Sequence, residues 1–180
     1  MFRVPLGDGA EIRPLEPWQA EAFASYIAEH REHLAPWLPW ATSITDADGA
    51  RAFLQRYADG QAADERRMYA LWLDGKLVGG CIFRIFDTYT RTCELGVWLS
   101  PAGEGRGLMT RACRELIAWA MDERGMNRVE WRCTPRNARS RAVAQRLGMT
   151  LEGVLRESSP FNGELLDTEV WALLARERKP

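Results

Sequence analysis

The spacing of apolar residues in the first third of the chain predicts two helices with a loop between them. Over residues 18–33 apolar side chains recur every three or four positions, which is typical of an amphipathic helix. Residues 34–43 read LAPWLPWATS, and two prolines in this run predict a loop that carries two tryptophans. A second helix is expected from a cap at Thr45 or Asp46 to about Tyr57.

From Arg67 onward the hydrophobic period shortens to two, which predicts strands. Segments 68–73 and 77–86 flank Asp74-Gly75, a dipeptide suited to the positive φ angles of a type I′ turn, so a β-hairpin is expected. A further strand is expected over residues 92–99. Its alternation places Cys93, Leu95, Val97 and Leu99 on one face and Glu94, Gly96 and Trp98 on the other.

The remaining segments mix helix and strand. A short strand is expected at 11–14, a helix from Leu108 to a stop at Gly125, a strand over 129–133 and a short helix over 140–147. Asn162-Gly163 predicts the turn of a last hairpin. At 180 residues the chain fits one α/β domain spanning residues 1–180.

Composition excludes several function classes. With 24 basic and 25 acidic side chains the net charge is −1, so no overall field attracts nucleic acid or anionic lipid. No apolar run approaches the roughly 18 residues of a membrane helix, and residues 1–10 do not resemble a signal peptide. We therefore expect a cytoplasmic protein that holds any anionic ligand locally.

The sulfur and imidazole side chains do not predict a metal site. The four cysteines form no C-x-x-C pair and lie within regular segments, so reduced, buried thiols are expected. His30 and His33 share a polar helix face far from any cysteine. The four cysteines are Cys81, Cys93, Cys113 and Cys133.

A glycine-rich stretch, SPAGEGRGLMT over residues 100–110, separates a predicted strand from a predicted helix. Its glycines allow the backbone to turn sharply and to direct several N–H groups at one anion, and the helix N-terminus adds a positive dipole end. Arg106 and Thr110 could add side-chain donors. The stretch lacks the Gly-Lys-Ser/Thr of a Walker A loop and the third glycine of a dinucleotide fingerprint. A phosphate site and a merely tight turn both remain open on this pattern.

Three motifs resemble the GCN5-related N-acetyltransferases (GNAT), and within them the RimJ/RimL group that acetylates ribosomal-protein N-termini. They are GRGLMT at 105–110, NARS at 137–140 and RLGMTLEGVLR at 146–156, and the resemblance covers nearly the whole chain. It implies an α/β (α+β) fold with a mixed, mostly antiparallel sheet of about seven strands and flanking helices. The strands at 92–99 and 129–133 would splay apart. The family usually has Gln or Arg where this chain has Ala102, so one side-chain contact would be lost.

The resemblance also implies acetyl-CoA as co-substrate, without a metal. The glycine loop would hold the diphosphate, and the pantetheine arm would insert between the splayed strands, where Asn137 would hydrogen-bond it. The residues implied in cofactor binding are Val97, Trp98, Leu99, Glu104, Gly105, Arg106, Gly107, Leu108, Met109, Thr110, Asn137 and Ser140.

Aminolysis of a thioester needs a neutral amine, a stabilised oxyanion and a proton for the departing thiolate. Glu94 resembles the family's strand glutamate, which deprotonates the amine directly or through water; the alternative is a solvated side chain on a half-exposed strand. Ser140 would protonate the thiolate, although it could equally be the N-cap of the helix that follows. Backbone N–H groups near Val97 would stabilise the oxyanion. A covalent route through Cys133 is the rival scheme.

Loop aromatics supply the candidate acceptor site: Trp37, Trp40, Tyr89 and Phe161 would line it, unless the two tryptophans plug a core edge or a dimer contact. The expected reaction is acetyl transfer to a primary amine, above all a protein N-terminal α-amino group, by direct attack in a ternary complex. Alternatives are a small-molecule or antibiotic amine acceptor, another donor such as succinyl-CoA, or a non-catalytic CoA-binding sensor. A homodimer is compatible with the resemblance.

Overall fold

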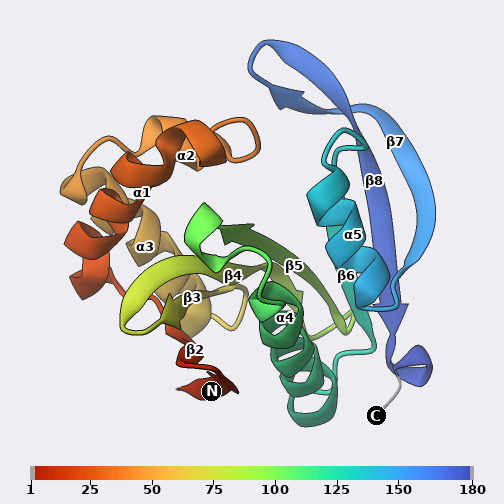
Figure 1. Ribbon diagram of the computed structural model, residues 1–180. Helices are drawn as coiled ribbons and strands as arrows, with labels where there is room; N and C mark the ends of the chain where they lie inside the picture. The colour runs from red at the N-terminus through yellow and green to blue at the C-terminus, as the bar shows by residue number, and fades with distance from the viewer. Residues whose placement is uncertain (1–2, 179–180) are drawn as a thin grey trace.

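The computed structural model describes residues 3–178 and shows an open mixed sheet with helices on both faces (Figure 1). Within these residues the sheet has eight strands in the order β1-β2-β3-β4-β5-β6-β8-β7. Every neighbouring pair is antiparallel except β5 and β6, which are parallel. The expected fold class is therefore confirmed. The strands are β1 (Val4–Gly7), β2 (Ala10–Pro14), β3 (Arg67–Leu73), β4 (Lys76–Asp87), β5 (Thr92–Leu99), β6 (Arg128–Cys133), β7 (Thr150–Phe161) and β8 (Glu164–Leu174).

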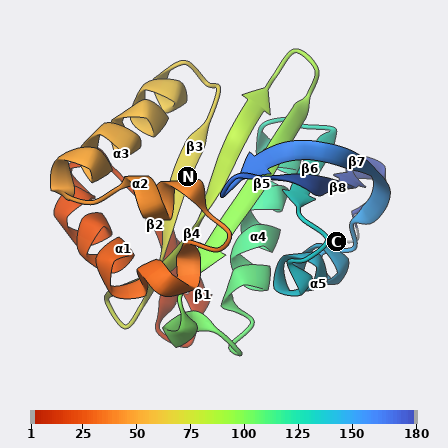
Figure 2. The same ribbon diagram turned by 90° about the horizontal axis from the view of Figure 1, so that it is seen from above.

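Helices α1, α2 and α3 cover one face of the sheet, and α4 and α5 cover the other (Figure 2). Each face has its own hydrophobic core: Phe23 and Trp98 belong to the first, and Leu95 and Leu116 to the second. The helices are α1 (Ala20–Leu34), α2 (Pro39–Ser43), α3 (Ala47–Ala62), α4 (Leu108–Ala118) and α5 (Ala138–Arg146), with short turns η1 (Pro17–Gln19), η2 (Pro101–Gly103), η3 (Trp119–Glu123, π-helical) and η4 (Ala175–Glu177).

The alternation of side chains on β5 follows the sequence prediction. Leu95 lies in the core beneath α4, while Trp98 lies in the core beneath α1 and α3. The predicted hairpin turns are also confirmed, because Asp74-Gly75 and Asn162-Gly163 each have two positive φ angles in succession.

Two helix predictions need correction. Residues 39–43, expected as loop, form α2, because Pro39 occupies the first helical turn, where its missing N–H is not needed. Helix α3 does not end near Tyr57 but continues through Gly60 to Ala62; Arg66 packs so closely over Gly60 that a Cβ there would lie 2.1 Å from the Cγ of Arg66. Asp46 is the N-cap, with its carboxylate accepting from the Gly49 amide at 2.8 Å.

The parallel pair β5 and β6 opens partway along its length. The two strands are in register only from Thr92↔Arg128 to Glu94↔Glu130. The remainder of each strand, residues 95–99 and 131–133, has no partner across this opening. The expected splay of these two strands is confirmed.

The cysteines are free thiols: Cys81, Cys93 and Cys113 are buried as expected, whereas Cys133 is only partly buried. Over residues 3–178 no cluster of three or more His, Cys, Asp or Glu side chains has the arrangement of a metal site. Among the same residues, no helix combines the length and apolar character needed to span a bilayer.

Candidate active site

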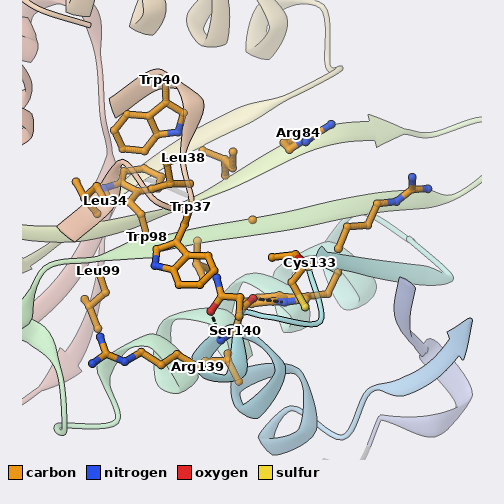
Figure 3. Close-up of a pocket in the computed structure, with 18 of the residues that line it drawn as sticks. Leu34, Trp37, Leu38, Trp40, Arg84, Trp98, Leu99, Cys133, Arg139 and Ser140 are labelled. Carbon is orange, nitrogen blue, oxygen red and sulfur yellow. Dashed lines mark hydrogen bonds between the residues drawn. The ribbon is translucent and has the colours of Figure 1, made fainter. Parts of the chain in front are cut away.

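A cavity of about 1390 Å³ begins at the opening between β5 and β6 and extends beneath α1 and α2 (Figure 3). The splay creates it, because the two strands no longer meet beyond Glu94. The glycine loop and the start of α5 line one end, and β4, α3 and the β7–β8 hairpin line the other. We call these the loop end and the sheet end.

At the loop end the backbone adopts the conformation that the glycines predicted. Gly105 and Gly107 have φ angles of +73° and +68°, and Gly107 is the N-cap of α4. Leu108, Met109 and Thr110, the first turn of α4, line the cavity. Amides at this position have no partner within the helix, so the loop end is suited to an anion.

Two charged residues of the loop behave differently from one another. Glu104 lines the cavity, accepts a hydrogen bond from Arg139 Nη1 at 2.5 Å and lies 3.4 Å from His33 Nε2. Arg106, predicted to contact the cofactor, is not among the residues that line the cavity; its carbonyl accepts from Arg111. The side-chain contact expected at Arg106 therefore stays a prediction, which the lining of this cavity does not support.

Strand β5 directs a backbone donor into the opening. The Ser100 amide donates to the Val78 carbonyl of β4 at 2.8 Å. Because N–H groups of an antiparallel strand alternate in direction, the amides of Val97 and Leu99 face away from β4, toward β6. The Val97 amide is thus an available donor at the splay. Val97, Trp98 and Leu99 all line the cavity, as predicted.

Glu94 lies at the point where the strands part, and its side chain is only 6% exposed. Arg84 Nε is 3.2 Å from one carboxylate oxygen, and Arg132 Nε is 3.7 Å from the other. Burial raises the pKa of Glu94, although both arginines oppose the rise and Glu130 adds to it. The alternative of a solvated outward side chain is wrong, because this carboxylate is buried and faces the cavity.

Asn137 and Ser140 hold the start of α5 beside the opening. The N-cap of α5 is Asn137, whose Oδ1 accepts from the Ser140 amide at 3.0 Å. The prediction that Ser140 could be the N-cap is therefore wrong: it lies in the first turn. Its Oγ instead accepts a hydrogen bond from Trp131 Nε1 at 2.9 Å (Figure 3).

Trp131 was not among the predicted site residues, yet it determines what Ser140 can do. An indole N–H only donates, so the hydroxyl uses a lone pair for Trp131 and keeps its own proton for another acceptor. The signal in the sequence was weak: a tryptophan on a buried strand needs a partner for its N–H, but nothing local identifies that partner.

Comparison with known proteins agrees with this geometry. The family model described as "Acetyltransferase (GNAT) domain" matches residues 10–150. The chain belongs to the GNAT acetyltransferase family. It is 34% identical to "Putative ribosomal N-acetyltransferase YdaF" of Bacillus subtilis, covering 98% of this chain and 97% of that protein. A crystal structure of a "Probable acetyltransferase" has a TM-score of 0.91 at 34% identity, with 99% of each chain covered.

A third GNAT relative shows the likeness of fold alone. RimL, a ribosomal L7/L12 α-N-protein acetyltransferase in complex with coenzyme A, has a TM-score of 0.92 at 21% identity and covers 98% of this chain and 99% of its own. This agreement extends the match beyond residue 150, over the β7–β8 hairpin that closes the sheet end.

In this GNAT enzyme Cys133 lines the cavity close to Ser140. Burial raises the pKa of its thiol, and the neighbouring Ser140 hydroxyl opposes the rise only in part. A thiol with a raised pKa is mainly protonated at neutral pH and is a poor nucleophile. The environment therefore does not favour the covalent scheme.

Aromatic side chains form the wall above the GNAT cavity. Trp37 and Phe161 line it, and so does Trp40, whose ring lies 5.5 Å from that of Trp98 and 5.6 Å from that of Phe23. Trp40 thus both plugs the core edge and faces the cavity. Tyr89 does not join them: it lies on the β4–β5 turn, is 95% exposed and is absent from the lining.

Proposed function

We propose that this acetyltransferase moves an acetyl group from acetyl-CoA to a primary amine, above all the N-terminal α-amino group of a protein, by direct attack in a ternary complex. One observation carries the proposal: a single cavity contains the anion-binding loop, the Val97 amide, Glu94 and Ser140. Relatives named as ribosomal N-acetyltransferases, such as YdaF and the ribosomal-protein-serine acetyltransferase of Escherichia coli, support this acceptor class.

The lining residues fit coenzyme A. The positive φ angles of Gly105 and Gly107 bring the first amides of α4 to one point, which suits a diphosphate. The unpaired edges of β5 and β6 offer hydrogen-bonding groups to the amide-containing pantetheine arm, and the Asn137 side-chain NH₂ adds a donor. When bound, acetyl-CoA supplies an activated acyl group as a thioester.

Glu94 is the proposed general base. An α-amino group with a pKa of about 7.7–8.0 is partly neutral near physiological pH, so one carboxylate, acting directly or through water, suffices to take the single proton that the nitrogen loses as the amide forms. The raised pKa of Glu94 brings the base closer to this range than an exposed glutamate would be. A lysine side chain, with a pKa near 10.4, would demand more of it.

Two further groups complete the reaction. The Val97 amide, free of any partner on β4, donates to the oxyanion that develops on the thioester carbonyl. Ser140 passes its hydroxyl proton to the departing thiolate and takes one back from solvent while Trp131 holds its oxygen in place, and Glu94 releases the amine's proton to solvent. Glu94 acts on the attacking amine, and Ser140 acts on the leaving thiolate. Both side chains line the same cavity, so they can act on one pair of bound substrates.

The test is release of free thiol from acetyl-CoA in the presence of a panel of peptides and small amines, with mass spectrometry to locate the acetyl group. Acetylation at peptide N-termini supports the proposal. Transfer to small amines alone would replace the acceptor class. Tight CoA binding without turnover on any amine would contradict the enzymatic function and favour a CoA-binding sensor.

A further inference from the structure

The sheet end of the cavity has a surplus of positive charge beside the proposed base. Three arginines line it, against two carboxylates, Glu94 and Asp167. Asp167 keeps its negative charge, but its Oδ1 accepts from the Glu157 amide at 2.9 Å, which holds the carboxylate within the β7–β8 hairpin. The arginines come from α3, β4 and β6 and are Arg56, Arg84 and Arg132.

Arg84 is the arginine best placed to meet an acceptor. Phe83 pairs with Leu95 and Ile85 with Glu94, so a β-bulge leaves Arg84 without a partner on β5. Its Nε lies 3.2 Å from Glu94, and the side chain as a whole remains 59% exposed. Arg84 therefore contacts the base with one edge and keeps other N–H donors for a second anion.

The other two arginines differ in availability: Arg132 is held by two carboxylates, whereas Arg56 is exposed and lies on α3, away from Glu94. Arg132 bridges Glu94 and Glu130, with its Nη2 donating to Glu130 at 3.1 Å. Arg56 lies over the Phe53 ring at 5.2 Å and has no anionic partner within residues 3–178. In Figure 3 Arg84 lies at the end of the cavity away from Leu99 and Arg139. Arg84 is thus remote from the loop proposed to hold coenzyme A.

An amine that hydrogen-bonds to Glu94 would lie within about 6 Å of the Arg84 guanidinium. A second positive charge on the acceptor at this distance would be repelled, whereas a carboxylate would find a planar donor group suited to it. We infer that the acceptor carries a carboxylate close to its reacting amine, an inference that rests on the proposed function. A peptide with an acidic side chain at its second position has this chemistry, and Arg84 is the residue that selects it.

The experiment measures kcat/KM for acetyl transfer to three peptide amides that differ only at the second position, where they carry Asp, Asn or Lys. With the wild type we expect the Asp peptide to be favoured over the Asn peptide about fivefold and the Lys peptide to be poorest. The preference should shrink as salt is raised from about 0.1 M to about 1 M, because partly exposed charges are screened.

Arg84→Gln should bring the ratio of Asp to Asn peptide close to one, and Arg84→Lys should keep part of it. The ratio is the readout because Arg84 also contacts Glu94, so absolute rates and the pH profile will change as well. Arg114→Gln is the matched control: this exposed arginine of α4 does not line the cavity, and the ratio should stay at the wild-type value. Retained CoA affinity shows that each variant is folded.

Three outcomes would overturn the inference. Equal rates on the Asp and Asn peptides would remove the carboxylate preference while leaving peptide acetylation intact. Faster acetylation of free aspartate than of the Asp peptide would contradict the peptide assignment. A preference for succinyl-CoA over acetyl-CoA that Arg84→Gln abolishes would assign the arginine to the acyl group instead. Failure to acetylate any amine would contradict the proposed function itself, a separate result.

Discussion

Replacing Glu94 by glutamine should separate the chemistry of this site from its stability. The carboxylate is buried and its pKa is raised, so above that pKa the folded protein holds a charge that the unfolded chain would hold at less cost. Glutamine has the same shape and removes this charge. The arginines beside it are 59% and 40% exposed and stay hydrated when their partner is lost. We expect stability at neutral pH to be unchanged within about 1 kcal/mol or slightly increased.

Turnover should respond very differently. Removal of a positioned general base lowers rates by about 10²–10⁴-fold, so kcat should fall by at least about 100-fold while CoA affinity stays near the wild-type value. In the wild type, activity should be lost as pH falls through the raised pKa of Glu94, because protonation removes the base. This acid limb should therefore lie above the usual range for a glutamate and should vanish in Glu94→Gln.

Glu169→Gln is a matched control. Its side chain is 5% exposed, as buried as that of Glu94, but it accepts hydrogen bonds from Arg141 Nε at 3.0 Å and Trp171 Nε1 at 2.9 Å and does not line the cavity. Loss of its charge should cost about 1–2 kcal/mol, which lowers Tm by about 2–8 °C in a protein of this length. Its kcat should remain within a few fold of the wild type.

The assays are thiol release for kcat, calorimetric titration for CoA affinity and thermal unfolding for Tm, all on the same preparations. A Glu94→Gln protein that keeps more than about a tenth of wild-type kcat would refute the assignment of the base. A large loss of Tm in Glu94→Gln without loss of turnover would show that this carboxylate is structural, like Glu169.

Three further predictions address the other groups of the site. Ser140→Ala should lower kcat about 10-fold or more with little change in CoA affinity. It should also lower the free energy of unfolding by about 1–3 kcal/mol, because the Trp131 N–H loses its acceptor. Unchanged kcat in a thiol-release assay would reassign the proton donor. Gly107→Ala should weaken CoA binding about 5- to 30-fold in a titration, because φ is +68° there and a Cβ disfavours that loop conformation. The control is Gly148→Ala, where φ is +76° but the residue does not line the cavity, so this change should lower Tm alone. Cys133→Ala should keep most of the activity, and its complete loss in single-turnover assays would revive the covalent route.

Local patterns predicted the elements that carry this site. The glycine loop, the helix after it and the strand with Glu94 were all expected from spacing alone, because each depends on neighbours in the sequence. Short-range chemistry also narrowed the helix cap to Thr45 or Asp46, of which Asp46 is the N-cap, and predicted both hairpin turns. The eighth strand, β1, was not predicted, since four residues at an edge show too little alternation.

Long-range relations were the part that the sequence did not reveal. The bulge that frees Arg84 exists only relative to the register of β5, and the partner of the Trp131 indole lies on a separate helix. Side-chain alternation predicted that Glu94 and Leu95 lie on opposite faces of β5, but it could not show whether the face of Glu94 meets solvent or a cavity. Tyr89 was assigned to the site because it is an aromatic residue in a loop, but the β4–β5 turn holds it in solvent.

The parting of β5 and β6 also affects the mechanics of the molecule. Within residues 3–178 three residue pairs join the two halves of the sheet there, so cohesion depends also on side chains packed between α4 and the sheet, including Leu116 of α4 and Val129 of β6. Dispersion contacts tolerate small sliding motions better than a hydrogen-bonded ladder does, because they have little directional preference. We therefore expect this seam to open more readily than the fully paired ladders on either side of it.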